Sequence, residues 1–479
     1  MRNIIKKINS LSQGFDVYAV GGFARDLLME RKHKDIDLVV NKNALKYSKQ
    51  IANAFNSKLV VLDDESKSYR IILKDKVIPN IDISLFRGKT IEQDLQDRDF
   101  TINAMAFSLK SFENFRQNII LSQKDTVKDL KSKIINTISP KSFKTDPLRM
   151  LRAFRFAAEL NFKLSKKTLL QIKQNVKLIS GIAVERIKNE IFAVLSAKNS
   201  VNLVDEMDKC GLLSKIFPLI KEMKKSRKKY YYHPGGLFQH SFETMEAIEN
   251  ILNNLQKFFP INCIELQEHF NDSNAFSENV TKMGLLKFAA LFHDNAKPET
   301  AKFENGKIHF LEHDKLGSEK IRKTMLSLKL GKKDVDYVTF LVEHHMRPSV
   351  LTSENMVTKR ASLKFFRDIG DKTPDLFIVS MADWYSYKKL KISSSKRLKF
   401  QEKYVKNLLK YYYELKNTKP LPKIIDGNMI MEKFNLNPGP LVGELLKIAT
   451  EAQHEGTVTD SAEALKLISS KLTQMGKKI

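Results

Sequence analysis

The chain has 479 residues, of which 42% are hydrophobic, so it exceeds a single core and should form two to four domains. Its net charge of +27, from 82 basic and 55 acidic residues, favours nucleic acid as a polyanionic partner, although a Lys-rich genomic bias would give the same excess. No apolar run approaches the roughly 20 residues that span a bilayer, and residues 1–8 lack a signal-peptide core. Two cysteines without metal-ligand spacing are typical of a reducing, cytoplasmic setting.

The pattern of apolar residues changes along the chain. Up to about residue 110 short alternating or apolar runs predict strands, and from about 140 helical spacing dominates. The expected fold class is therefore an α/β head, with a small mixed sheet and helices, followed by a mostly α-helical remainder. Two interruptions, Lys221–Lys229 and Asn417–Pro422, are interpreted as a linker and a second boundary. The predicted strands are Val17–Val20, Ile36–Val40, Leu59–Asp63, Tyr69–Leu73 and Ile81–Leu85.

A glycine pair and an aspartate pair accompany the first two predicted strands. Gly21 and Gly22 allow a tight turn in which backbone amides approach phosphate, and Arg25 adds a fixed positive charge. Asp35 and Asp37 are two residues apart, so on a strand they point to the same side and can hold divalent metal together. Each pair alone is common in turns and solvated loops. Their combination at this spacing predicts metal-assisted nucleotidyl transfer.

Later segments add candidate contacts to this site. Asp82 lies in an alternating strand, where it could face the aspartate pair as a third carboxylate or stand in solvent. Arg98 can bind triphosphate and Asp99 a ribose hydroxyl, although alone they would form a surface ion pair. Asp146 and Arg149 are three apart on one predicted helix face, where they could read a base or simply pair with each other.

These segments together resemble the class II tRNA nucleotidyltransferase and bacterial poly(A) polymerase family, over residues 16 to about 200. The resemblance implies that Asp35 and Asp37 bind catalytic Mg²⁺, with Asp82 as a further catalytic carboxylate. It also implies that Asp146 and Arg149 select the base and that the segment around Glu190 braces a helical neck. The implied nucleotide-binding residues are Gly21, Gly22, Arg25, Arg98, Asp99, Asn103, Asp146, Arg149, Arg152 and Arg155.

Three positions depart from the family pattern. Asp97 stands where the family usually has the first of two arginines, and Thr145 stands where a glutamate usually opens the base-reading motif. The glycine-rich turn is replaced by Ser122–Thr126. In the family that turn helps a flexible element reposition between CTP and ATP, so its loss bears on whether the full C-C-A sequence is made.

Histidines and aspartates recur in order through the later helical part. Any single one would more often be structural, but the ordered set resembles the HD phosphohydrolase superfamily. The resemblance implies a second divalent metal (Mg, Mn, Ni, Fe or Zn), with enough ligands for two ions. It also implies hydrolysis of phosphomonoesters or cyclic phosphodiesters, for instance 2′,3′-cyclic ends on RNA; a helical domain that only shapes the tRNA-binding body is the alternative. The candidate ligands are His240, His293, Asp294, His313, His344, His345 and Asp383.

The segments Asp426–Met431 and Asn437–Gly443 resemble the C-terminal part of the same enzymes. The expected domains are a head at 1–138, a helical neck and RNA-binding domain at 139–225, an HD domain at 226–400 and a helical tail at 401–479. The leading interpretation is an enzyme that builds the C-C-A end of tRNA from CTP and ATP by two-metal catalysis. The alternatives are a poly(A) polymerase, an A-adding or CC-adding partial enzyme, an HD phosphohydrolase whose head only binds RNA, and a non-catalytic RNA-binding protein.

Overall fold

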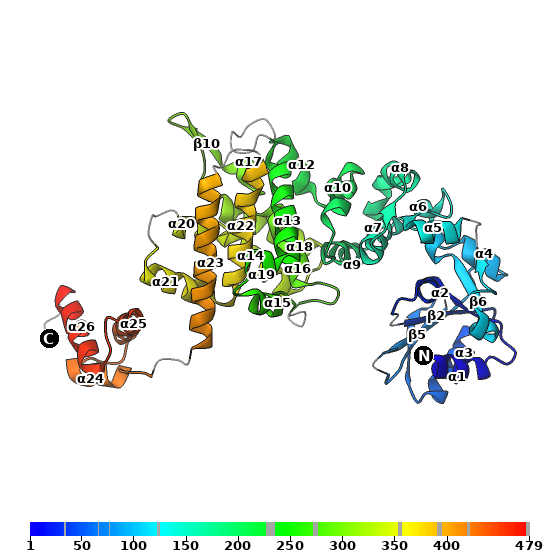
Figure 1. Cartoon of the computed structure of the whole chain (residues 1–479), viewed down its shortest axis with the longest axis horizontal. Coiled ribbons are helices and arrows are strands. Elements are labelled where there is room, and N and C mark those ends of the chain that lie inside the picture. The colour runs from blue at the N-terminus through cyan, green and yellow to red at the C-terminus, as the bar shows by residue number, and fades with distance from the viewer. Residues whose placement is uncertain are drawn as a thin grey trace. The chain divides into compact units, whose positions relative to one another are not determined.

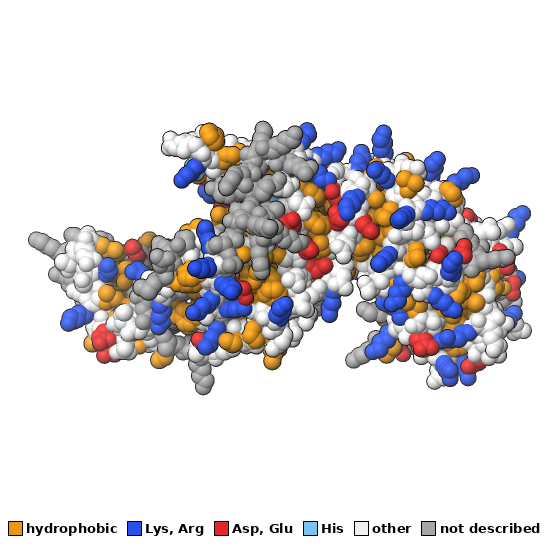
Figure 2. All heavy atoms as spheres, turned by 45° about the horizontal axis from the view of Figure 1, so that its top comes forward, with side chains coloured by type: hydrophobic (Ala, Val, Ile, Leu, Met, Phe, Trp, Pro, Cys, Tyr) orange, Lys and Arg blue, Asp and Glu red, His pale blue; other side chains and the backbone are white. Residues whose placement is uncertain are grey.

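The structure is a computed structural model of the chain (Figure 1). It describes residues 1–32, 35–65, 67–75, 77–121, 125–226, 235–271, 276–352, 357–389, 395–418 and 422–475. The chain forms two compact units. The first contains Met1–Lys225 with the segments 275–285 and Arg322–Val335, and the second contains the remainder. In the described ranges no helix has the length and apolar character needed to cross a membrane. Lys and Arg side chains are spread over the face that Figure 2 shows.

The described part of the head contains a seven-stranded sheet with the order β3-β4-β5-β2-β1-β6-β7. The β2–β5 pair is parallel, while the other pairs are antiparallel, so the sheet is mixed as expected. All five predicted strands are confirmed, each to within one residue. The strands are β1 (Val17–Val20), β2 (Asp35–Val40), β3 (Lys58–Asp63), β4 (Ser68–Ile72), β5 (Asn80–Leu85), β6 (Met105–Ser108) and β7 (Ile120–Leu121).

Helices accompany this sheet. In α3 the residues Ala44, Tyr47 and Ile51 are buried at helical spacing, and this face packs against β4. Helix α2 begins at Gly21 itself, directly after β1. The two glycines that were expected to form a turn are therefore the first two residues of the helix. The head helices are α1 (Arg2–Ser10), α2 (Gly21–Leu28), α3 (Ala44–Ala54), α4 (Ile91–Gln96) and α5 (Thr126–Ser132), with 3₁₀ turns η1 (Thr101–Asn103) and η2 (Leu109–Asn114).

The neck is a succession of short helices in which α7 packs against α9. The predicted linker is wrong for Lys221–Lys225, which belong to α12, because Leu219, Ile220 and Met223 form a buried face. Residues 227–229 of that stretch lie outside the described ranges. The elements are β8 (Ile134–Ile135), α6 (Ser142–Thr145), α7 (Arg149–Leu160), β9 (Lys163–Leu164), α8 (Lys166–Asn175), η3 (Val176–Gly181), α9 (Val184–Leu195), α10 (Val201–Lys209), α11 (Leu212–Ile216) and α12 (Pro218–Lys225).

The described residues of the later part of the chain form helices and the β10–β11 hairpin. Helices α13 and α22 pack against each other, and the helical character expected beyond about residue 140 is confirmed. The elements are α13 (Leu237–Asn253), α14 (Leu255–Phe258), α15 (Cys263–Asn271), α16 (Lys282–Phe292), α17 (Lys297–Thr300), β10 (Ala301–Glu304), β11 (Lys307–Phe310), α18 (His313–Ser327), α19 (Lys332–His344), α20 (Arg347–Leu351), α21 (Lys359–Ile369), η4 (Gly370–Lys372), α22 (Thr373–Lys389) and α23 (Ser395–Asn417).

The tail has a small core of its own, which includes Ile430, Leu445 and Ile468. Helix α23 ends at Asn417, where the second boundary is predicted, and residues 419–421 lie outside the described ranges. Asp426 caps the next helix by accepting a hydrogen bond from the amide of Met429. The tail helices are α24 (Gly427–Phe434), α25 (Pro440–Glu455) and α26 (Ser461–Gln474).

Candidate functional sites

The parallel strands β2 and β5 bring the head carboxylates together. Asp37 stands opposite Asp82, and Asp35 stands opposite Asn80, whose Nδ2 donates to Asp35 Oδ1 at 2.9 Å. Burial, and then the negative charge of Asp82, raise the pKa of Asp37 to about 6, although Arg98 opposes the rise. A buried carboxylate beside another carboxylate is stabilised in its charged form by a divalent cation. The chemistry of this donor set therefore fits Mg²⁺.

Asp82 also has a protein partner that the sequence analysis did not single out. Arg70 on β4 lies directly across from Asp82 and donates to its two carboxylate oxygens at 2.7 Å each. Such a bidentate pair is among the stronger charge-assisted contacts in proteins. Asp82 is thus shared between a guanidinium on one side and the Asp37 carboxylate on the other.

The glycine at the start of α2 leaves room for the Arg98 guanidinium beside the carboxylates. Gly21 has φ +63°, and a Cβ added there would lie 2.8 Å from Arg98 Nη1. Arg98 is itself held by Asp94, whose Oδ2 accepts from Arg98 Nη2 at 2.9 Å. Arg25 is buried, and its Nη1 donates to Asn103 Oδ1 at 2.7 Å. Glycine at this position lets Arg98 approach the backbone at the start of α2.

Asp99 is buried and joins the head to α7. Its Oδ2 accepts from Arg152 Nε at 3.0 Å and Nη2 at 2.7 Å, and its Oδ1 accepts from Asn103 Nδ2 at 3.1 Å. Burial alone would raise the pKa of this carboxyl, but Arg152, with help from Asn103 and Arg149, holds the pKa at about 2. In the structure this carboxylate orients an arginine of the site. Its predicted contact with a ribose stays a prediction.

Asp146 and Arg149 do not share a helix face. Helix α7 begins at Arg149, and Asp146 has an extended backbone with φ −142°, because the proline at 147 disfavours helical conformation in the residue before it. Asp146 instead pairs with Arg186 on α9 at 3.5 Å. Arg149 Nη2 donates to the backbone oxygen of Asp97 at 2.8 Å. The prediction of one helix face is wrong, yet both side chains reach the same cavity.

That cavity has a volume of about 540 Å³, which is the size of a small-molecule site. Six arginines line it, and they outnumber the aspartates there, so an anion such as a triphosphate is favoured. Arg87 and Phe156 are lining residues that the sequence patterns did not indicate. The predicted site residues among its lining are Gly21, Gly22, Asp37, Asp82, Arg98, Asp99, Asn103, Asp146, Arg149, Arg152 and Arg155.

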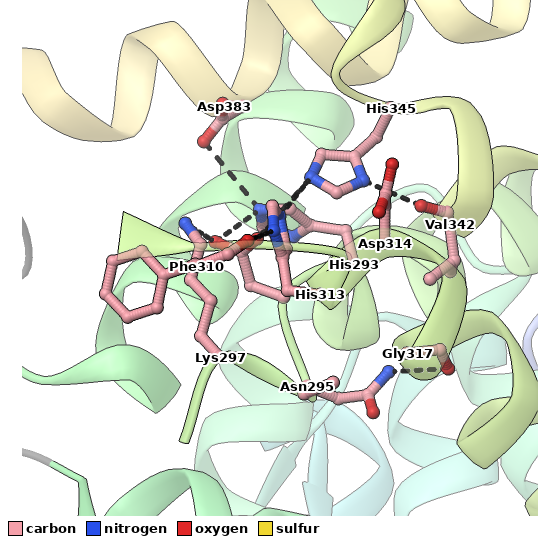
Figure 3. Close-up of polar contacts among 12 residues, drawn as sticks. His293, Asn295, Lys297, Phe310, His313, Asp314, Gly317, Val342, His345 and Asp383 are labelled. Carbon is pink, nitrogen blue, oxygen red and sulfur yellow. Dashed lines mark hydrogen bonds and ion pairs between the residues drawn. The ribbon is translucent and has the colours of Figure 1, made fainter. Parts of the chain in front are cut away.

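A second cluster forms in the other unit (Figure 3). His240 on α13 places Nε2 at 3.0 Å from Asp383 Oδ1 on α22 and at 3.2 Å from His293 Nε2. Asp294 Oδ2 lies 3.2 Å from His293 Nε2 and 3.4 Å from His240 Nε2. The two imidazoles and two carboxylates converge on one point, as ligands of a metal ion do.

The other oxygen of Asp294 faces two more histidines. Oδ1 lies 3.3 Å from His313 Nε2 and 3.4 Å from His345 Nε2. One carboxylate therefore has histidines at each of its two oxygens. Such an arrangement fits a bridging ligand between two ions.

Each of the four histidines is held by a contact at Nδ1, the ring nitrogen that points away from the cluster. Nδ1 of His293, His313 and His345 each contacts the backbone oxygen three residues earlier, at 2.7 Å. Nδ1 of His240 instead contacts Ser386 Oγ at 2.8 Å. With Nδ1 carrying the proton, each Nε2 presents a lone pair inward, because a hydrogen bond at one ring nitrogen fixes the orientation of a histidine that binds metal through the other.

The electrostatics of the cluster also fit a bound cation. Burial opposes a charged imidazole at His293, but the carboxylates of Asp294 and Asp383 raise its pKa to about 10. Lys297 Nζ lies 2.6 Å from Asp294 Oδ2. Positive charge is thus strongly favoured at this point. A divalent ion would replace the proton that His293 otherwise takes up.

His344 is the one predicted ligand that the structure places apart from the cluster. Its ring packs edge-on against Phe340, with ring centroids 4.4 Å apart. Among the described residues, ligand atoms within 4.8 Å of one another come from His240, His293 and Asp383 and from His293, Asp294 and His345.

Three family models match the chain in order. A poly(A) polymerase head domain matches residues 17–136, a probable RNA- and SrmB-binding site of polymerase A matches 161–224, and an HD domain matches 237–388. The tail beyond 388 lies outside these matches.

Individual proteins match almost end to end. The CC-adding tRNA nucleotidyltransferase of Thermus thermophilus is 26% identical over 457 residues, covering 94% of this chain and 92% of that protein. The A-adding tRNA nucleotidyltransferase of Deinococcus radiodurans is 26% identical over 452 residues, covering 93% of each. The solved Thermotoga maritima CCA-adding enzyme complexed with tRNA is 23% identical, with a TM-score of 0.66 over 98% of this chain and 95% of that one. At that identity the last likeness establishes the fold.

Proposed function

Because the chain belongs to the tRNA nucleotidyltransferase and poly(A) polymerase family with a fused HD domain, we propose that it builds the C-C-A end of tRNA from CTP and ATP. The observation that carries this proposal is the head cavity, where Asp37 and Asp82 stand opposite each other among six arginines. The cavity offers carboxylates for a metal and guanidinium groups for a triphosphate in one place.

The chain's own residues would position the reactants. Asp35 and Asp37 are the proposed Mg²⁺ ligands; bound Mg²⁺ lowers the pKa of an RNA 3′ hydroxyl and offsets the charge of pyrophosphate. Arg98 would hold the triphosphate so that its α-phosphorus faces that hydroxyl. A bond forms between the 3′ oxygen and the α-phosphorus while the α–β bridge breaks. Pyrophosphate leaves with the bonding electrons, and the hydroxyl proton passes to water.

Base selection is proposed for Asp146 and Arg149. Arg149 is held through the backbone oxygen of Asp97, so the departure from the family pattern at 97 leaves this contact intact. Thr145 is exposed, and its Oγ1 donates to the Lys141 backbone oxygen at 3.2 Å rather than pointing to the base-reading pair. Both departures are therefore compatible with a working base pocket.

A second candidate function is addition of C-C alone. Two observations favour it: the Thermus relative that matches 94% of the chain is named as CC-adding, and the turn at 122–126 lacks its usual glycines. Residues 122–124 of this turn lie outside the described ranges.

The deciding experiment uses tRNA transcripts that end before C-C-A, after one C and after two. Each is incubated with the protein and Mg²⁺ and with CTP, ATP or both, and products are sized at single-nucleotide resolution. Ordered growth to C-C-A followed by arrest supports the first proposal. Arrest after C-C with both nucleotides supports the second, long A tails indicate a poly(A) polymerase, and no growth on any transcript contradicts both.

For the HD domain we propose a divalent metal site that hydrolyses phosphoesters, including 2′,3′-cyclic ends on RNA. Its ligands would be His240, His293, Asp294, His313, His345 and Asp383. A bound ion of this kind activates water and steadies the phosphate. Hydrolysis of a nucleoside 2′,3′-cyclic phosphate should depend on added Mg, Mn, Ni, Fe or Zn and should be lost in Asp294→Asn. Equal hydrolysis by that variant would refute the assignment.

A further inference from the structure

The hairpin of β10 and β11 is inserted between the ligands Asp294 and His313, and only the backbone oxygen of Phe310 takes part in the site described above. Its register pairs Ala301 with Phe310 and Phe303 with Ile308. Because side chains alternate along a strand, Phe303, Ile308 and Phe310 share one face. The opposite face carries Lys302, Glu304, Lys307 and His309, all exposed. Figure 1 shows the hairpin projecting beyond α17, so both of its faces extend away from the helices.

The apolar face begins at the metal cluster. The Phe310 ring lies 6.5 Å from the His313 ring, and Lys297 Nζ lies 5.4 Å from its centroid. The backbone oxygen of Phe310 is the partner of His313 Nδ1 at 2.7 Å. Figure 3 shows Phe310 beside Lys297 and His313. The residue that orients one ligand therefore also starts the apolar face.

The same face ends in solvent. Phe303 is 74% exposed, although it is a large aromatic side chain, and Leu311 at the base of the hairpin is 61% exposed. A single exposed Phe is common on protein surfaces. Here, however, it is a diagonal neighbour of Phe310, and such neighbours in an antiparallel pair lie about 7–8 Å apart. The two rings are spaced to form a short aromatic surface that leads outward from the cluster.

We propose that this hairpin face is a stacking platform for the terminal base of an RNA whose 3′ or 2′,3′-cyclic phosphate lies at the HD cluster. This inference rests on the proposed phosphohydrolase function and names the group that the site recognises. Aromatic rings flanked by basic side chains are what single-stranded nucleic acid binds, through stacking and phosphate contacts. Lys297, whose Nζ lies 5.4 Å from the Phe310 ring centroid, supplies such a charge beside the aromatic face, while Lys302 and Lys307 lie on the opposite face with Glu304.

The test is a binding measurement on the full chain. The probe is a short RNA with 2-aminopurine as its last base and a 3′-phosphorothioate, which the head cannot extend; stacking quenches its fluorescence. Quenching is expected in the presence of Mg²⁺, and Phe303→Ala should weaken binding about ten-fold. Phe303→Trp, which keeps a ring, should retain the affinity. Phe400→Ala, which removes a Phe that is 41% exposed on α23, is the matched control.

The inference is overturned if Phe303→Ala and Phe400→Ala bind the probe equally, or if the wild-type chain gives no quenching. Hydrolysis separates this result from the underlying function. The ratio of kcat/KM for an RNA 3′-phosphate over glycerol 2-phosphate, which lacks a base, should fall about ten-fold in Phe303→Ala. If the wild type hydrolyses neither substrate, the phosphohydrolase proposal fails, and the fluorescence result alone decides whether the platform exists.

Discussion

One hydroxyl sets the orientation of His240. Ser386 Oγ donates to the backbone oxygen of Asp383 at 2.6 Å and contacts His240 Nδ1 at 2.8 Å. A hydroxyl has a single proton, and because that proton goes to the carbonyl, Ser386 must accept from Nδ1–H of the imidazole. Nε2 of His240 is then left with its lone pair toward Asp383 and His293.

Removal of this hydroxyl should weaken metal binding without removing a ligand. Ser386→Ala is expected to lower the metal affinity of the HD cluster about 10- to 100-fold, measured by competition with a chelator. Ser386→Thr, which keeps the hydroxyl, should restore it. Ser380→Ala, which removes a buried hydroxyl from the same helix, serves as the control. Unchanged affinity in Ser386→Ala would show that His240 is oriented by other contacts.

Asp99 should make the head sensitive to acid. Its pKa of about 2 in the folded chain lies below the ordinary value of 3.8, so the ionised carboxylate stabilises the fold above the unfolded pKa. This contribution, about 2 kcal/mol for a shift of this size, is lost as pH falls through the folded value. Urea unfolding of the wild type and Asp99→Asn should therefore differ most above pH 4 and converge below it. A gap that stays constant with pH would contradict the role given to Arg152.

At the scale of elements, the start of α2 depends on glycine for two reasons. Gly21 has φ +63°, and its missing Cβ makes room for Arg98. Gly14 has φ +79° but nothing within 4 Å of its missing Cβ. An alanine at Gly14 therefore tests the effect of positive φ without any steric contact. Both alanine variants should lose about 1 kcal/mol of stability, because an L-residue is strained at positive φ. Only Gly21→Ala should also displace Arg98, raise the KM for the nucleotide several-fold and slow addition. Equal kinetics in the two variants would exclude the steric role.

The sequence indicated elements better than contacts. Strands β1 and β2 were predictable because their apolar patterns are local, but the sequence left open whether Asp82 meets Asp37 or stands in solvent, since this depends on which strands pair. Arg70 could not be identified, since its place opposite Asp82 depends on how β4 pairs with β5. The start of α7 was placed too early, because the proline at 147 keeps Asp146 extended and the helix begins only at Arg149. His344 is the last residue of α19 and His345 follows it, so the sequence, which does not mark where the helix ends, could not say which of the two faces the cluster.

For the whole molecule, the two ligand sets belong to different compact units. The head carboxylates lie on β2 within Met1–Lys225, whereas His293 and Asp294 lie in the second unit. Each set is completed by side chains of its own unit: Asp37 by Asp82, and His293 by Asp383. Neither site thus uses a side chain from the ligand set of the other.

The two chemistries should therefore be separable by single substitutions. Asp37→Ala removes a proposed Mg²⁺ ligand and should lower nucleotide addition to tRNA at least 1,000-fold, by about 4 kcal/mol of transition-state stabilisation. The same variant should still hydrolyse a nucleoside 2′,3′-cyclic phosphate. His293→Asn should show the converse, with circular dichroism to verify that the buried site has folded. If either substitution silences both reactions, the two sites are coupled and cannot be assigned independently to the two units.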